Sequence, residues 1–168
     1  FRSFYPGIDL KMVTSHGKVK TSFVIRGRLQ IPAAFADGYL SMSQLIEIPD
    51  GLTTDLSHAI PLVDDRFLGA MDINDKNNEK FFDFTRSYAF DARENSENYF
   101  EMPFTFSKNR IDYYVPVSWL NDQKTLYPVT LDPIVSSSVT VPQATITGSG
   151  FTAVCGTDRK STRLNSSH

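Results

Sequence analysis

The chain of 168 residues has very little cysteine, no long hydrophobic run and no helical repeat of apolar residues. Cys155 is the only cysteine, which excludes a disulfide within the chain. No apolar run approaches the length of about 20 residues that a membrane-spanning helix needs, so we expect no direct membrane insertion. Only residues 118–122, after Pro116, are expected to form a single helical turn.

Catalytic signatures are also missing. The chain contains no Gly-x-Ser-x-Gly, no His-Glu-x-x-His and no phosphate-binding glycine loop. We therefore predict that it is not an enzyme and binds no cofactor. A glycosidase, however, uses two acids that lie far apart in sequence, so this reading stays open for the candidate acids Asp9, Asp83, Asp91 and Glu101.

Positive charge is scarce too. The chain has 17 Lys and Arg against 19 Asp and Glu, a net charge of −2. Three of the basic residues and none of the acids lie in residues 159–168, so the rest is more acidic still. This balance argues against nucleic acid or anionic lipid as the main partner.

Both ends of the chain look irregular. The polar residues 159–168 resemble translated sequencing-adaptor read-through, and we interpret them as an artefactual tail. The chain begins at Phe1, without Met or a signal segment, directly before a turn and a strand. We interpret this start as an N-terminal truncation.

What the sequence does have is apolar alternation with a period of two. It predicts one β-hairpin over residues 8–25 and a second over residues 100–115. Isolated hairpins cannot bury their apolar faces, so we predict an all-β fold, an antiparallel β-sandwich or curved sheet built from hairpins. The alternation places Phe104 and Tyr113 in the core, and Glu101 and Asp112 in solvent.

Short apolar runs and turn residues predict further strands between the two hairpins. Pro128 and Pro133 bracket one more short strand, expected at a sheet edge or end. From residue 136 the composition turns to Ser, Thr and Gly, which predicts a linker. We therefore expect a β-rich module over residues 1–135, with a proteolytic core ending between residues 133 and 140. Residues 136–158 are expected to be a linker and the start of a truncated next module.

Two groups of residues are candidate contact sites. Asp75, Asn77 and Glu79 alternate oxygen ligands as calcium requires, but the expected glycine is missing and Lys76 opposes a cation. We interpret them as a solvated hairpin tip. Tyr99 and Tyr114 have the opposite parity to the apolar faces, so we consider them as surface contacts.

Four short motifs carry a resemblance. They are YPGIDL at residues 5–10, SYAFDA at 87–92, VPVSWL at 115–120 and YPVTLDP at 127–133. In this order they resemble the β-rich domain that precedes repeat arrays in large secreted bacterial surface proteins, which carry β-propeller, immunoglobulin-like or adhesin-type repeats.

The resemblance implies an extracellular or cell-surface location and a non-catalytic, structural or adhesive role. It implies neighbouring modules of the same chain as partners, together with a surface glycan or protein. Two alternatives stay open: an accessory N-terminal segment of a secreted hydrolase, and a carbohydrate-binding module.

Overall fold

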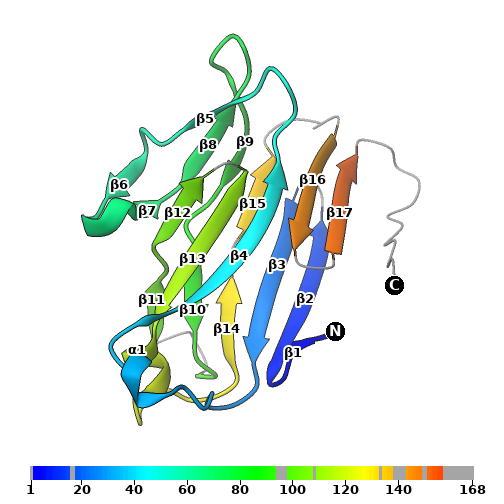
Figure 1. The fold of residues 1–168 in the computed structure, drawn as a ribbon. Coiled ribbons are helices and arrows are strands. Elements are labelled where there is room, and N and C mark those ends of the chain that lie inside the picture. Colours follow the sequence, from blue (N-terminus) through cyan, green and yellow to red (C-terminus); the bar gives the residue numbers. More distant parts are fainter. Residues whose placement is uncertain are drawn as a thin grey trace.

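The computed structural model describes residues 2–15, 18–93, 98–107, 109–132, 134–137, 143–148 and 151–156. These residues form two antiparallel sheets with a hydrophobic core between them (Figure 1). The all-β fold predicted from the sequence is confirmed. The expected tail at residues 159–168 lies outside the described residues, as do loop residues 16 and 17.

The larger sheet, called sheet A, has ten strands, and sheet B has seven. Sheet A comprises β1 (Arg2–Tyr5), β2 (Ile8–Ser15), β3 (Lys18–Ile25), β5 (Thr53–Asp55), β8 (Met71–Asn74), β9 (Lys80–Phe84), β10 (Tyr88–Phe90), β11 (Tyr99–Glu101), β14 (Val129–Asp132) and β15 (Ile134–Ser137). Sheet B comprises β4 (Tyr39–Glu47), β6 (Ala59–Pro61), β7 (Phe67–Gly69), β12 (Phe104–Ser107), β13 (Arg110–Pro116), β16 (Gln143–Gly148) and β17 (Phe151–Gly156).

Helical structure in the described part of the chain is short. The α-helix α1 spans Val117–Asn121, where one turn was expected, and two 3-10 turns span Ala33–Phe35 and Val63–Asp65. None of these helices is long and apolar enough to cross a membrane.

Strand order places β3 at the centre of sheet A. One edge of β3 pairs with β2 along its whole length, from Ile8 opposite Ile25 to Ser15 opposite Lys18. Its other edge pairs first with β15 and then with β14. The first predicted hairpin is thus confirmed, and Gly7 before it has a φ of 82°, the left-handed conformation that its turn requires.

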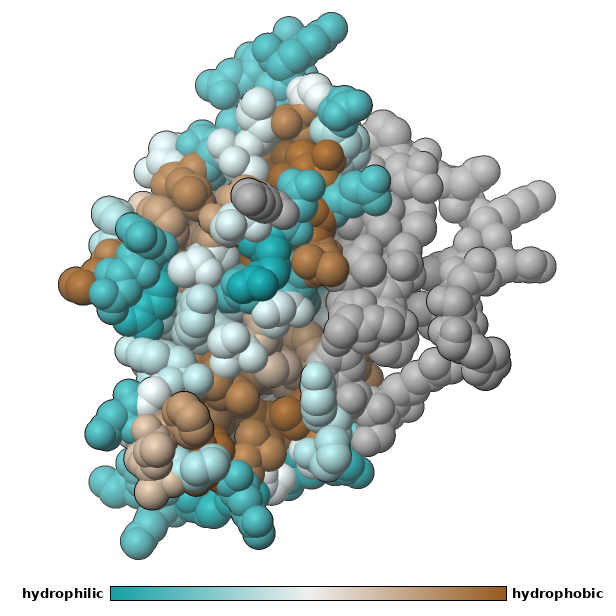
Figure 2. All heavy atoms as spheres, in the orientation of Figure 1, coloured by the Kyte–Doolittle hydropathy of each residue, from teal (hydrophilic) through white to brown (hydrophobic). Residues whose placement is uncertain are grey.

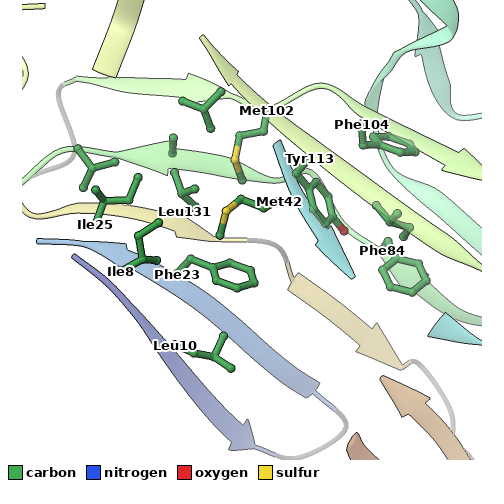
Figure 3. Close-up of a cluster of buried hydrophobic side chains, with 14 of the residues drawn as sticks. Ile8, Leu10, Phe23, Ile25, Met42, Phe84, Met102, Phe104, Tyr113 and Leu131 are labelled. Carbon is green, nitrogen blue, oxygen red and sulfur yellow. The ribbon is translucent and has the colours of Figure 1, made fainter. Parts of the chain in front are cut away.

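The core lies between the inner faces of the two sheets. Side chains from β2, β3 and β14 meet side chains from β4 and β13 there (Figure 3). Phe104 and Tyr113 are 5% and 3% exposed, which confirms that both are core residues. The labelled side chains in Figure 3 are Ile8, Leu10, Phe23, Ile25, Met42, Phe84, Met102, Phe104, Tyr113 and Leu131.

The second predicted hairpin is shorter than expected. Strands β12 and β13 pair as predicted, but residues 99–101 form β11 in the other sheet. The chain passes from sheet A to sheet B at Met102 and Pro103, and Pro103 lacks the N–H group that would continue a ladder. A second crossing follows Gly69, whose φ is 104° and where an added Cβ would lie 3.1 Å from the His58 carbonyl oxygen.

The prediction that Asp112 faces solvent is wrong, because this residue is only 5% exposed. It points outward, but β13 lies between β12 and β4, and neighbouring side chains cover it. Arg110 donates to Asp112 Oδ2 from Nε at 2.8 Å and Nη2 at 2.7 Å, and the Ser43 hydroxyl donates to Oδ1. Glu101 does lie on an outer face and is partly exposed.

Pro128 and Pro133 had suggested that β14 lies at a sheet edge or end, but this strand lies inside sheet A. It pairs with β10 on one side and with β3 on the other, because Val129–Asp132, which forms both ladders, lies between the two prolines. Strands also continue beyond residue 135: β15 pairs with β3 and β9, and β16 pairs with β4. The linker composition did not predict these strands, while the domain boundary itself stays a prediction.

The Tyr113 hydroxyl provides a test of the core. It is buried and has no hydrogen-bond partner among the described residues. Burial raises the pKa of this phenol. Removing an unpaired buried polar atom costs nothing, so Tyr113→Phe should leave the free energy of unfolding unchanged or raise it by up to about 1 kcal/mol.

Urea unfolding measures this change, and Tyr127→Phe is the matched control. The Tyr127 hydroxyl donates to the Leu120 carbonyl oxygen at 2.8 Å, so its removal should lower the free energy of unfolding by about 1 kcal/mol. A loss at Tyr113 as large as at Tyr127 would mean that the Tyr113 hydroxyl is hydrogen-bonded.

Candidate functional site

The outer face of sheet A presents two rows of side chains that cross the neighbouring strands β11, β10, β14, β3 and β2. Cross-strand partners point to the same side of a sheet, and the alternate residues Ala89 and Leu131 are buried in the core. The first row is Glu101, Tyr88, Asp132, Ser22 and Lys11. The second row is Tyr99, Phe90, Thr130, Val24 and Asp9.

Three aromatic rings gather at one end of these rows. The Tyr88 ring centroid lies 6.0 Å from that of Phe90 and 5.8 Å from that of Tyr99. Tyr88 and Phe90 are half-buried, whereas Tyr99 is 59% exposed. We call these three residues the aromatic cluster.

Charged pairs flank the aromatic cluster. Asp132, next to Tyr88 in the first row, accepts from Lys20 Nζ at 2.6 Å and from the Ser22 hydroxyl at 3.1 Å. On the other side of Tyr88, Glu101 pairs with Arg86 at 3.4 Å. Each acid has its own base, so this part of the face offers donors and acceptors in equal measure.

Tyr114, the other predicted surface contact, lies on sheet B and not beside Tyr99. The Arg66 guanidinium carbon is 4.3 Å from the Tyr39 ring centroid and 5.8 Å from that of Tyr114. The Tyr114 hydroxyl also forms a 3.0 Å hydrogen bond with Thr105. Tyr114 is thus half-buried and engaged by its own chain. In the orientation of Figure 1, the described part of this face carries both hydrophilic areas and hydrophobic patches (Figure 2).

Asp91 has the most completely bonded carboxylate of the described residues, and its side chain is 0% exposed. It accepts from Asn98 Nδ2 at 2.9 Å, from the backbone N–H groups of Arg93 and Leu126 at 3.0 and 3.2 Å, and from Arg93 Nη1 at 2.9 Å. Burial by itself would raise the pKa of Asp91, but these hydrogen bonds outweigh it and hold the pKa below its ordinary value of 3.8. Asp91 therefore ties β10 to two loops.

Asp72 is another buried carboxylate that joins separate segments. It accepts from Lys80 Nζ at 3.3 Å and lies 3.1 Å from His58 Nδ1. Lys80 Nζ also donates to Asp83 at 3.2 Å, and its hydrogen bonds to Asp83 and Asp72 raise its pKa. Asp72 and Asp83 are cross-strand partners on β8 and β9, and Lys80 bridges the two carboxylates.

The four acids left open as a glycosidase pair contact different basic residues. Each forms an ion pair with a different basic residue: Asp9 with Arg26, Asp83 with Lys80, Asp91 with Arg93, and Glu101 with Arg86. No two of these four acids share the same basic partner among the ion pairs described.

The Asp75 turn uses its carboxylate internally. Asp75 Oδ1 accepts the backbone N–H groups of Glu79 at 2.9 Å and Asn77 at 2.8 Å, and these bonds, that of Glu79 first, lower the pKa of Asp75. Asn78 between them has a φ of 63°. In the part of the chain that the structure describes, no group of three His, Cys, Asp or Glu residues is placed to hold a metal ion.

The sequence did not single out Tyr88, Phe90 or Asp132. In the run of residues 88–90, a small Ala89 separates two aromatic residues, and three residues cannot show which phase faces the core. The available signal was the small size of Ala89, which the structure buries completely. A small inward residue leaves the larger neighbours to the outer face.

Comparisons with known proteins return no match. No protein-family model, curated protein or solved structure matches this chain. The class that the structure defines is an antiparallel β-sandwich with an aromatic cluster on one outer face.

Proposed function

We propose that this chain is a non-catalytic structural or adhesive module of a large secreted or cell-surface bacterial protein. One observation supports it: the buried carboxylates are used as cross-links. Asp72, Asp91, Asp112 and Asp132 each bind two or more donors from neighbouring strands or loops.

This arrangement suits a module that carries load or presents a surface. Buried carboxylates paired with bases and N–H groups fix the register of strands, and removing one partner leaves an uncompensated buried group. The order of motifs along the sequence supports the extracellular location. The partners that we propose are neighbouring modules of the same chain and a surface glycan or protein.

Asp91→Asn distinguishes a structural from a catalytic carboxylate. The variant replaces an acceptor of four hydrogen bonds by an amide that can accept only part of them, so we expect unfolding to become easier by about 2–3 kcal/mol. Guanidinium unfolding measures the loss, and Asp83→Asn, which breaks only a surface ion pair, should cost about 1 kcal/mol or less.

The pH dependence follows from the lowered pKa. The contribution of Asp91 is complete above the unfolded-state value of 3.8 and disappears as the pH falls through the lower folded-state pKa. The wild-type advantage over Asp91→Asn should therefore shrink in acid. Turnover of a glycan or peptide substrate, abolished by a single Asp or Glu substitution that leaves unfolding unchanged, would contradict the proposed function.

A further inference from the structure

The aromatic cluster on sheet A has no part in the core. In an antiparallel sandwich the outer face normally carries polar residues. Here Tyr88, Phe90 and Tyr99 are neighbours on that face, and Tyr99 remains 59% exposed. An exposed aromatic ring supported by two half-buried ones on an outer sheet face is a feature of binding surfaces.

The polar groups beside the cluster restrict the class of ligand. Asp132 with Lys20 and Glu101 with Arg86 place two acids and two bases next to Tyr88. The balanced charges give no preference for a polyanion such as nucleic acid, which requires a basic surface. The partly exposed groups, Lys20, Arg86 and Glu101, offer hydrogen-bond donors and an acceptor to an uncharged polar molecule.

We propose that the outer face of sheet A binds a neutral glycan chain across β11, β10 and β14. Sugar rings have apolar C–H faces that stack on aromatic rings, and hydroxyl groups that both donate and accept hydrogen bonds. The aromatic cluster and the ion pairs supply both kinds of contact side by side. Three strands span roughly 10 Å at about 4.8 Å per step, enough for a short oligosaccharide.

This inference rests on the proposed function and names the ligand of an adhesive module. The side chain that contributes most is Tyr99, because it is the most exposed ring of the cluster. Tyr88 and Phe90 support it from the neighbouring strand. The partly exposed Lys20 ammonium, which the buried Asp132 holds in place, and the Arg86–Glu101 pair then orient the sugar hydroxyls.

The test screens the whole chain against immobilised neutral and acidic oligosaccharides, and the neutral oligosaccharide that binds best is then titrated by calorimetry. We expect Tyr99→Ala to weaken its binding about tenfold or more and Tyr99→Phe, which keeps the ring, to stay within about threefold. Tyr39→Ala is the matched control, since Tyr39 is a partly exposed tyrosine on sheet B. It should leave affinity unchanged, and thermal unfolding of each variant verifies that it is folded.

The outcomes separate this inference from the proposed function. Absence of binding to any neutral oligosaccharide, binding to acidic glycans alone, or equal loss in Tyr99→Ala and Tyr39→Ala would overturn the glycan site. Each of these results leaves the non-catalytic module standing. Cleavage of the bound oligosaccharide would overturn the non-catalytic function and leave the binding site in place.

Discussion

Replacing Phe104 with alanine should lower the free energy of unfolding by about 3–5 kcal/mol, as deletion of a well-packed core aromatic does. Phe104 is 5% exposed, and its ring centroid lies 5.9 Å from that of Phe67 and 6.5 Å from that of Tyr113. It is the cross-strand partner of both residues, on β7 and β13. Its removal would leave a cavity where three strands of sheet B meet the core.

Chemical denaturation of wild type and Phe104→Ala measures this loss. Phe35→Ala removes the same group from a position that is 62% exposed, and it should cost less than about 1 kcal/mol. Equal effects at the two positions would show that the Phe104 ring is not packed in the core. The predicted inner face of β12 would then be wrong.

Alternation correctly placed the apolar residues Phe104 and Tyr113 in the core, but it did not predict which sheet each apolar run joins. Met102 and Phe104 both point into the core, but the first belongs to the crossing between sheets and the second to sheet B. Because the inner faces of a sandwich face each other, the same alternation persists when the chain changes layer. The apolar run over residues 67–73 also divides between the layers, with β7 in sheet B and β8 in sheet A.

Local sequence patterns could not predict which polar residues are buried. Asp112 has the outward parity that the sequence assigned to it, and the covering groups come partly from Ser43, which lies 69 positions away. Asp91 is bonded to Leu126 across 35 positions. Such partners are set by strand order, which composition and periodicity do not contain.

The candidate site shows the same limit. Exposure of Tyr99 followed from parity and is confirmed, whereas its role as a contact stays a prediction. Its neighbours Tyr88 and Asp132 come from strands that pair only in the folded chain. The Ser- and Thr-rich strands after residue 135 were missed because strand preference depends largely on packing against neighbours.

Strand β15 is expected to be indispensable, although it lies at the predicted end of the module. It is the only strand between β3 and β9 in the described part of sheet A, with three paired residues toward each. A chain ending at residue 132 would separate β9, β8 and β5 from the rest of the sheet. With about 0.5–1.5 kcal/mol for each lost backbone hydrogen bond, we expect it to lose at least about 3 kcal/mol or fail to fold.

A chain ending at residue 137 provides the matched comparison. It keeps β15 and removes β16 and β17, whose pairing to the rest of the described sheet is limited to residues 45–47 of β4. We expect this shorter chain to unfold cooperatively and to lose less stability than the chain ending at residue 132. Removing β16 and β17 uncovers only part of one edge of β4. This result would also agree with a proteolytic core ending between residues 133 and 140.

Two outcomes would contradict these expectations. Equal stability of the chains ending at 132 and 137 would show that β15 does not join the two parts of sheet A. A chain ending at 137 that fails to fold would place the β16–β17 hairpin inside the module.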